Sequence, residues 1–408
     1  MSYFTDFVRG FLDLGATVIL PVVIFLLGLF FRQKIGAAFR SGLTIGVAFV
    51  GIFLVIDLLV KNLGVSLNVI DVGWPATSSI AWASSVAAFI IPLGIIVNVV
   101  LLVTKVTKTM NVDIWNFWHY TFTAAMVYAV SGSIWQALLA AVIFQVICLK
   151  VADWTAPMMS EFFDLPGVSI ATGSTISYAP GIYLVKLLQR VPGLNKLDAD
   201  PETIQKRFGA FGESIFVGLI LGLGIGVLAG YKPGDIINLG MSMAAVMVLM
   251  PRMVKILMEG LMPVSESART RLNKRFGERE IYIGLDAAVA LGHPAVISTA
   301  LILVPITVLL AVILPGNQVL PFGDLATIPF VVAFIVGAAR GNIIHSVIVG
   351  TIMIAISLYI ATDVAPIFTD MAKGTNVQMP KGSSEISSID QGGNIVNYLI
   401  FKLFSLFN

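Results

Sequence analysis

Apolar runs of about 20 residues recur along the chain and constrain its fold more than any other feature, because a helix of roughly that length crosses a bilayer. Charged residues make up only 12% of the 408 residues, whereas a soluble domain has about a quarter. We therefore predict an all-α polytopic membrane protein with about nine to eleven crossings or part-crossings. The candidate spans are 14–31, 41–60, 86–104, 120–147, 213–230, 239–262, 295–314, 325–339 and 343–362, with weaker pieces at 168–188 and 281–292.

Lysine and arginine gather in a few loops between these runs, which predicts the orientation of the chain. Cytoplasmic loops carry an excess of both residue types, so the basic loops are expected inside and the N-terminus outside. The acidic stretch 363–394 is predicted to be an outside loop. The start of the chain lacks a cationic segment followed by a cleavage site, so we interpret it as a retained first span. The basic clusters are Arg32/Lys34/Arg40, Lys105/Lys108, Lys186/Arg190/Lys196/Lys206/Arg207 and Arg269/Arg271/Lys274/Arg275/Arg279.

Two stretches share a pattern of helix breakers and hydroxyl residues. DVGWPATSSIAW (71–82) contains Gly-Trp-Pro-Ala, and LGHPAVISTA (291–300) contains Gly-His-Pro-Ala. Further matches follow in the same order, such as Pro92 with Pro305. This order predicts two structural repeats, which we expect to be inverted, with re-entrant or broken helices near the membrane midplane as in many transporters. The alternatives are that proline-containing apolar helices simply look alike, and that the breaks are loops at the membrane surface.

The repeats predict how the chain is organised. The parts are a first transmembrane repeat at 1–150, a connecting segment at 151–235 with a hydroxyl-rich stretch at 167–181 and a cytoplasmic loop at 188–212, a second transmembrane repeat at 236–362, and a polar outside loop with a short C-terminal apolar segment at 363–408.

Polar residues within the apolar runs are candidates for a substrate site, because ionisable groups are costly inside a membrane. Asp71 and Asp286 precede the two Gly-x-Pro breaks, while His119 and Thr123 lie on one face of a helix. The stretch GVSIATGSTISYAPG (167–181) adds small hydroxyl residues. Carboxylates, hydroxyls and an imidazole suit a neutral polyhydroxy ligand. The absence of lysine and arginine from these stretches argues against an anionic one.

The sequence contains no motif for catalysis or for a cofactor. It has no Walker A loop, dinucleotide fingerprint, HExxH motif or nucleophile elbow. The single cysteine, Cys148, excludes an internal disulfide and a cysteine metal site. We therefore expect no catalytic residues, no cofactor and no metal, and the net charge of +2 gives no indication of nucleic acid binding. Energy for any transport must then come from an ion gradient or from another protein.

The blocks DVGWPATSSIAWAS, NVDIWNFWH, QKRFGAFGES, GLDAAVALGH, PGNQVLPFGDLATI and DQGGN are spread over nearly the whole chain. Together they resemble the galactitol-specific IIC permeases of the bacterial phosphoenolpyruvate-dependent sugar phosphotransferase system, in the ascorbate–galactitol superfamily. The resemblance implies a multi-pass homodimer in the bacterial inner membrane, in contact with membrane lipids. Each protomer would have a scaffold domain and a core domain that moves in an elevator-like way. The permease by itself would not be an enzyme, because the cytosolic IIB protein, working with IIA, would phosphorylate the polyol.

The resemblance also implies which residues bind the substrate, expected to be galactitol or a similar sugar alcohol. Related ascorbate permeases match this chain after Asp71, at His119 and Thr123, in GVSIATGST and at Asp286. The rival hypotheses are an ion-coupled polyol transporter with Asp71 or Asp286 as a proton or sodium site, and a channel or structural subunit. His293 has the alternative of facing lipid headgroups. The predicted substrate-binding residues are Asp71, Trp74, His119, Thr123, Thr172, Ser174, Thr175 and Asp286, with His293 and Asp324 as second choices.

Overall fold

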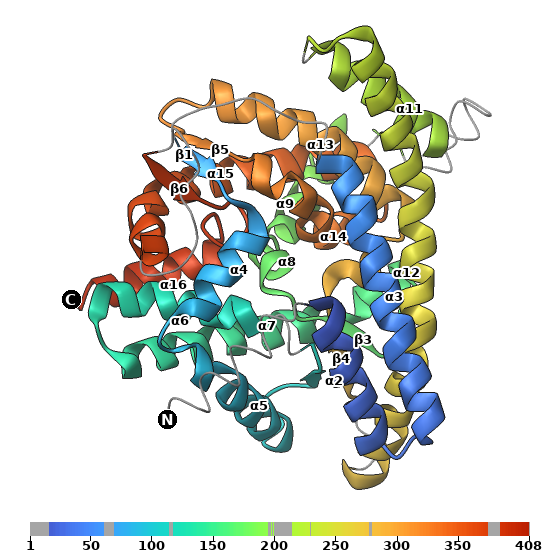
Figure 1. Ribbon diagram of the computed structural model, residues 1–408, viewed down its shortest axis with the longest axis vertical. Coiled ribbons are helices and arrows are strands. Elements are labelled where there is room, and N and C mark those ends of the chain that lie inside the picture. Colours follow the sequence, from blue (N-terminus) through green and yellow to red (C-terminus); the bar gives the residue numbers. More distant parts are fainter. Residues whose placement is uncertain are drawn as a thin grey trace.

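The structure is a computed structural model that describes residues 16–60, 69–113, 117–194, 197, 199, 214–228, 230–276, 280–373 and 384–407. Most of the chain is helical, as the sequence predicted. Much of the predicted cytoplasmic loop at 188–212 lies outside the described residues. The helices form two groups in Figure 1: a column of long helices on the right, and a wider body on the left that contains the strands.

Four helices pack side by side into the column (Figure 1). They are α2 (Ala16–Phe30), α3 (Ile35–Val60), α11 (Ser214–Leu228) and α12 (Pro233–Phe276). In this column α2 contacts α3, α3 contacts α12, and α12 contacts α11. The 44 residues of α12 give it a length of about 66 Å, which is roughly twice the thickness of the hydrocarbon core of a bilayer.

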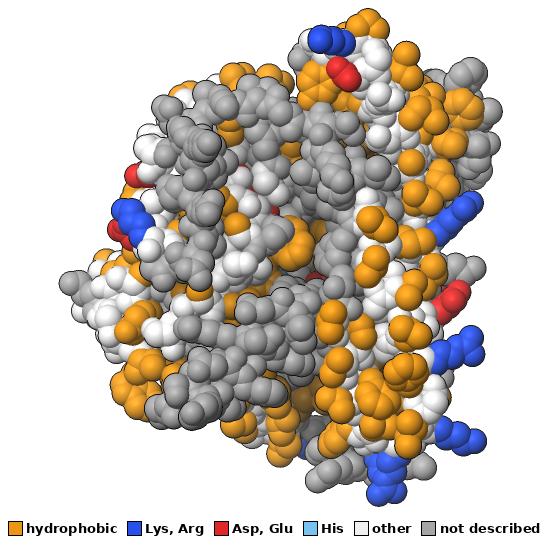
Figure 2. All heavy atoms as spheres, in the orientation of Figure 1, with side chains coloured by type: hydrophobic (Ala, Val, Ile, Leu, Met, Phe, Trp, Pro, Cys, Tyr) orange, Lys and Arg blue, Asp and Glu red, His pale blue; other side chains and the backbone are white. Residues whose placement is uncertain are grey.

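Apolar side chains cover the outer face of the column, as Figure 2 shows. On α2 and α3 they recur about every fourth residue, which is the spacing of one helix face. A surface of this kind is one that lipid or another protein covers. The exposed side chains are Val18, Val22, Leu26 and Phe30 on α2, and Ile35, Phe39, Leu43, Val47, Val50 and Leu54 on α3.

The remaining helices form the body of the molecule. They are α4 (Gly73–Ala83), α5 (Ala87–Val103), α6 (Trp118–Ser131), α7 (Ile134–Phe162), α8 (Gly173–Ser177), α9 (Pro180–Leu188), α13 (Pro294–Ile313), α14 (Ile328–Ala338), α15 (Ile343–Lys373) and α16 (Ile395–Ser405), with the 3-10 helices η4 (Ala287–Ala290) and η5 (Phe322–Thr327).

Several helices of the body have the length and composition of membrane spans. Among the described residues α7, α13 and α15 pass this test individually, and α4 and α5 form one further pair bent by 92°. The bend lies between Ala83 and Ala87, after the stretch 71–82 in which the sequence predicted a break, and Gly73–Pro75 instead begin α4. The other apolar runs of the described chain form shorter helices or belong to the column. The described residues therefore account for only part of the crossings that the sequence predicted.

The described part of the chain also contains six short strands, which the all-α prediction missed. They are β1 (Val69–Asp71), β2 (Thr109–Asn111), β3 (Val168–Ile170), β4 (Tyr282–Leu285), β5 (Val319–Leu320) and β6 (Glu385–Ser387). They form two parallel three-stranded sheets, with the orders β5-β1-β6 and β2-β4-β3. Each sheet therefore joins segments that are far apart in the sequence.

The length of these strands explains why the sequence pattern did not reveal them. They have between two and four residues, which is too short for an alternating pattern to stand out. Non-helical backbone at membrane depth must nevertheless find hydrogen-bond partners inside the protein. Pairing supplies them: Val69 of β1, for example, lies opposite Val319 on one side and Glu385 on the other.

Two chain segments cross in close contact at the first Gly-x-Pro break. Gly73 leads from β1 into α4 with a φ of +74°, a conformation that glycine adopts without strain. A Cβ atom on Gly73 would lie 2.7 Å from the carbonyl oxygen of Gly323 in η5. In turn, a Cβ atom on Gly323 would lie 2.5 Å from the carbonyl oxygen of Asp71. The absence of side chains at both positions lets β1 and η5 touch.

The stretch 363–394, predicted as an outside loop, is structured where it is described. Residues 363–373 complete α15, and 384–394 enter the body as β6 and the segment that follows it. Ser388 and Gln391 are 0% exposed. These polar side chains are buried because neighbouring elements supply their hydrogen-bond partners, which composition alone does not reveal.

We expect Gly323→Ala to destabilise the protein, because the added methyl group would overlap backbone rather than a flexible side chain. Overpacking of this kind costs about 1–3 kcal/mol and should lower the unfolding temperature of the detergent-purified protein. Gly224→Ala in α11 is the matched control, since a Cβ there meets nothing within 4 Å. Equal unfolding temperatures for the two variants would contradict the close crossing.

Candidate functional site

The carboxyl ends of the two sheets meet at one polar cluster in the body. In the first sheet Asp71 ends β1, Asp324 follows β5 and Asp390 follows β6; in the second, Ser174 follows β3 and Asp286 follows β4. The Gln391 Nε2 donates both to the Ser174 hydroxyl and to the Asp390 carboxyl group, and so joins the ends of the two sheets. Ligands of open parallel sheets also bind beyond the carboxyl ends of the strands, so this cluster is the candidate site.

Asp324 holds three segments of the chain together. Its Oδ1 accepts a hydrogen bond from the Trp74 amide at 2.8 Å. Its Oδ2 accepts from the Ser388 hydroxyl at 2.6 Å and from the Asp390 amide at 3.1 Å. Asp324 is 0% exposed. It therefore fixes the start of α4 and the segment after β6 against η5.

Asp71 has a similar structural role on the other side of the same crossing. Its two oxygens accept hydrogen bonds from the amides of Gly73 at 2.8 Å and Ile389 at 3.4 Å. In the described part of the chain, no lysine or arginine forms a salt bridge with Asp71, Asp324 or Asp390.

His119 of α6 and Ser174 of α8 meet in the same cluster. The His119 Nε2 lies 3.1 Å from the Ser174 Oγ. That oxygen also accepts from the Gln391 Nε2 at 3.4 Å. Either atom of the His119–Ser174 pair can be the donor, according to the tautomer of the imidazole.

A chain of side-chain hydrogen bonds connects α6 and α16 with Asp390. The Thr123 hydroxyl donates to the Asn397 Oδ1 in a close contact. The Asn397 Nδ2 donates to the Gln391 Oε1 at 2.8 Å, and the Gln391 Nε2 donates to the Asp390 Oδ1 at 3.0 Å. None of these four residues is more than 4% exposed. Solvent therefore does not compete for these bonds.

Three other predicted site residues are engaged with backbone groups. The Thr175 hydroxyl donates to the Phe330 carbonyl in α14 at 2.9 Å. The Thr172 Oγ1 accepts from the Ala287 amide at 2.9 Å, which connects the ends of β3 and β4. Asp286 accepts from an amide of η4 at 2.6 Å and caps that helix, and it remains partly exposed. Asp286 thus lies between the buried cluster and the surface.

Trp74 and His293 lie in different surroundings. Trp74, in the first turn of α4, is partly exposed, and Asp324 holds its backbone amide. The His293 Nδ1 accepts a hydrogen bond from the Ala295 amide at 3.2 Å and so caps α13. Its ring packs against Phe162 at the end of α7, with ring centroids 4.4 Å apart. The structure therefore gives His293 a capping role that the sequence interpretation did not include.

Sequence reasoning missed the polar residues that the segment after β6 brings into the cluster. The DQGGN block that contains Asp390 and Gln391 was assigned to an outside loop. Asn394 accepts hydrogen bonds from two amides in the first turn of α16, and it donates to the Gly173 carbonyl at 3.1 Å. An asparagine just before an apolar run is a helix-start signal. That signal would have predicted a helix running from Asn394 through Asn397, with the DQGG residues next to it.

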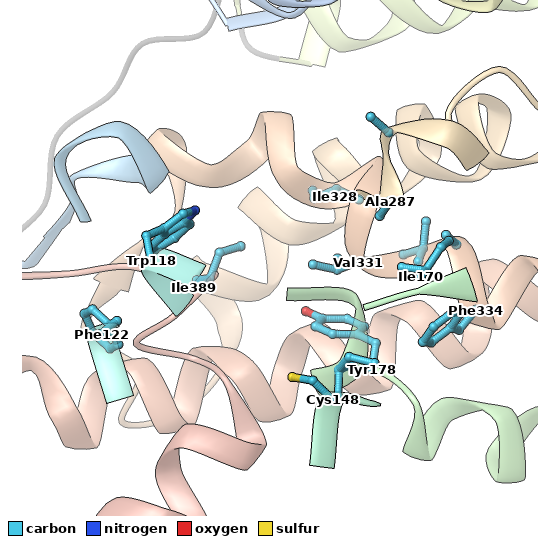
Figure 3. Close-up of a cluster of buried hydrophobic side chains, with 14 of the residues drawn as sticks. Trp118, Phe122, Cys148, Ile170, Tyr178, Ala287, Ile328, Val331, Phe334 and Ile389 are labelled. Carbon is cyan, nitrogen blue, oxygen red and sulfur yellow. The ribbon is translucent and has the colours of Figure 1, made fainter. Parts of the chain in front are cut away.

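Buried apolar residues adjoin members of the cluster in the sequence: Trp118 precedes His119 and Ile389 precedes Asp390, and both belong to the buried hydrophobic side chains drawn in Figure 3. The Trp118 ring lies against His119 with ring centroids 4.1 Å apart. In such surroundings hydrogen bonds are strong, and an unpaired polar group is costly. Among the described residues, no group of His, Cys, Asp and Glu is arranged to hold a metal ion. The cluster consists of hydrogen-bonding groups suited to an uncharged ligand.

Comparisons with known proteins give a consistent result. A family model described as "PTS system sugar-specific permease component" matches residues 10–382. A galactitol-specific EIIC component of this system from Escherichia coli K12 is 43% identical over 414 residues, covering 98% of this chain and 91% of the relative. A putative permease IIC component from the same strain is 39% identical over 407 residues, covering 97% of this chain and 93% of the relative.

We expect the variants Asp71→Asn and Asp324→Asn to differ in stability. In Asp71→Asn the amide nitrogen can take the place of the oxygen that accepts only the long 3.4 Å bond from Ile389, so a small loss is expected. In Asp324→Asn the new amide nitrogen would face amide or hydroxyl donors at either oxygen position. One buried unpaired donor costs about 1–3 kcal/mol. Thermal unfolding of the purified variants measures this difference.

The matched control for these variants is Asp370→Asn. Its side chain is 62% exposed and pairs only with Lys373 at the surface, so little change is expected. If Asp71→Asn were as destabilised as Asp324→Asn, the larger structural role of Asp324 would be contradicted.

Proposed function

Because this chain belongs to the family of sugar-specific permease components of the phosphotransferase system, we propose that it carries galactitol across the membrane for phosphorylation by a cytosolic IIB protein. The relative at 43% identity is galactitol-specific, and the alignment covers 98% of this chain. The ion-coupled transporter hypothesis is not favoured, because this family depends on phosphorylation. The permease itself holds and releases the polyol, and phosphoryl transfer takes place on IIB, which IIA supplies with phosphate.

The observation that carries this proposal is the composition of the buried cluster. Every hydroxyl of a sugar alcohol both donates and accepts hydrogen bonds. The cluster offers carboxylates as acceptors, an amide as a donor, and an imidazole and a hydroxyl that each both donate and accept. Lysine and arginine, which would select a charged substrate such as a sugar phosphate, form no salt bridge with Asp71, Asp324 or Asp390 in the described structure. The site therefore suits the unphosphorylated polyol.

We divide the residues of the cluster according to their hydrogen-bond partners in the structure. Asp390, Ser174, His119 and Gln391 bond mainly to one another, so a polyol hydroxyl can replace one of these partners without moving the backbone. These four residues are the proposed hydroxyl ligands. Asp286 and Trp74 are partly exposed and would contact the polyol from the rim, with the indole against its C–H groups.

The other predicted residues are proposed to support the site. Asp71 and Asp324 hold backbone amides at the crossing of β1 and η5. Thr123, Thr172 and Thr175 hold neighbouring side chains or backbone in place. His293 caps α13 among the aromatic side chains of α7, and we assign it no contact with the polyol.

The sheet topology supports two structural repeats. If β1, β2 and β3 correspond to β4, β5 and β6, exchanging the two sets turns the order β5-β1-β6 into β2-β4-β3, which is the order of the other sheet. The helices follow the same pattern, since the pair α6 and α7 comes after β2 and the pair α14 and α15 after β5. Asp71 then corresponds to Asp286. We propose that the repeats are inverted, which puts their broken helices at one site near the midplane.

The division into column and body supports a scaffold and a core that move relative to each other. The body contains both sheets and the polar cluster, and the column presents a continuous apolar outer face on α2 and α3. We propose that the column is the scaffold, that its apolar face contacts lipid and a second copy of the chain, and that the body carries the polyol in an elevator-like movement. The protein would act as a homodimer in the bacterial inner membrane.

We expect calorimetric titration of the purified protein to show saturable binding of galactitol, without sodium, and weaker binding of sorbitol and mannitol. Asp390→Asn should reduce galactitol affinity, because a buried hydroxyl or amide donor loses a charged acceptor, which costs about 1–3 kcal/mol. Asp370→Asn, on the exposed face of α15, is the control and should bind like the parent. Absence of heat with every hexitol would reject the polyol proposal, and unchanged binding by Asp390→Asn would reject the assignment of Asp390.

A second expectation concerns movement between column and body. The chain has one cysteine, Cys148, which is buried, so a pair of introduced cysteines would react with little background. Joining α11 to α13, which are in contact, should stop galactitol uptake and leave binding intact, with recovery after reduction. A pair joining α11 to α12 within the column should not affect uptake. Full uptake with α11 joined to α13 would contradict the elevator-like movement.

A further inference from the structure

The hydrogen bonds from Thr123 to Asp390 all run in one direction. Each side chain donates to the next: the Thr123 hydroxyl to Asn397, the Asn397 amide to Gln391, and the Gln391 amide to Asp390. The two carboxamides have one donating and one accepting end each, so either of them could in principle be turned around. This series of hydrogen bonds presents the donor end of the Gln391 amide to Asp390 only if other groups fix its direction.

Two groups that can only accept fix that direction. The Asn397 Nδ2 donates both to the Gln391 side chain and to the Gln391 backbone carbonyl at 3.2 Å. A carbonyl oxygen has no proton to give, so turning the Asn397 amide would place two oxygens together. At the other end, an Asp390 carboxylate likewise accepts from the Gln391 Nε2. The Gln391 amide is therefore held between two neighbours that both require its present orientation.

The start of α16 fixes the position of Asn397 in turn. Asn394 caps this helix, accepting from the Asn397 amide at 3.1 Å, and donates to the Gly173 carbonyl at the start of α8. Ser174, the next residue in α8, shares the Gln391 Nε2 as a donor. Asn397 and Gln391 are at most 1% exposed. Asn397 thus lies behind Gln391, on the side away from Asp390 and Ser174.

We propose that Asn397 is a positioning residue that holds the Gln391 amide with its donor end toward Asp390 and Ser174, and that this orientation contributes to the choice between hexitols. The inference rests on the proposed polyol site. Hexitols differ only in the directions of their hydroxyl groups. A site that offers a donor at one fixed point favours the isomer that places an acceptor there, because the mismatched isomer leaves a buried group unpaired.

Asn397→Asp tests this inference because it replaces the donor behind Gln391 with an acceptor of the same shape. The Gln391 amide would turn to donate to the new carboxylate, and its oxygen would then face Asp390 and Ser174. Galactitol affinity should fall about tenfold or more, and the ratio of galactitol to sorbitol affinity should fall with it. A change that merely loosened the structure would reduce the binding-competent fraction for all hexitols alike and leave this ratio unchanged.

The matched control is Asn98→Asp, the same substitution at another buried asparagine. Asn98 is 4% exposed, donates to the Thr109 carbonyl and accepts from the Asn111 amide, so its loss should affect stability without altering the affinity ratio.

A double variant, Asn397→Asp with Asp390→Asn, provides a donor for the turned Gln391 oxygen. The loss caused by Asn397→Asp should therefore be smaller in the Asp390→Asn background than in the parent.

If Asn397→Asp does not fold, Gln391→Glu gives the same test, because it keeps the acceptor for Asn397 and removes the donor to Asp390. Folded Asn397→Asp or Gln391→Glu protein with the parental affinity ratio would overturn the inference. Failure of the parent to bind any hexitol would instead reject the proposed function. These two outcomes are distinguished by titrating the parent first.

Discussion

Backbone that is not helical needs hydrogen-bond partners within the protein when it lies at membrane depth, and the architecture of the body depends on how this need is met. Short parallel strands at the breaks satisfy part of it. Carboxylates satisfy another part: Asp71 binds the Gly73 amide, and Asp324 binds the amides of Trp74 and Asp390. Acidic residues thus occur in this apolar chain because they hold the breaks together, before any role in substrate binding is considered.

The acidic residues of the cluster are of two kinds, which differ in the groups that donate hydrogen bonds to them. Asp71 and Asp324 accept mainly from backbone amides, so a ligand that took their hydrogen bonds would open the crossing of β1 and η5. The side chain of Asp390 instead accepts from the side chain of Gln391. Side-chain partners can be exchanged for other hydroxyl or amide groups at small cost. The site that we propose would therefore exchange hydrogen bonds while the surrounding backbone stays in place.

The sequence predicted those features that depend on local patterns. Long apolar runs gave the membrane helices, and helical spacing placed His119 and Thr123 on one face. The strands escaped because they have two to four residues and exist only through partners elsewhere in the chain. The segment from Ser388 to Asn397 escaped for a related reason: its polarity is typical of a solvent-exposed loop, and its burial depends on partners such as Asp324 and Thr123, which are distant in sequence.

The strand orders have a consequence for how the chain functions as a unit. In each of the two sheets the central strand comes from one half of the chain and both outer strands come from the other half. The pairing of β1 with β6 joins segments separated by more than half of the sequence. Neither half can satisfy its own broken segments, so we expect the two halves to fold as one cooperative body. The polar cluster lies where the two sheets meet. The elevator-like movement that we propose would therefore carry both sheets together, with sliding at the boundary between the body and the column.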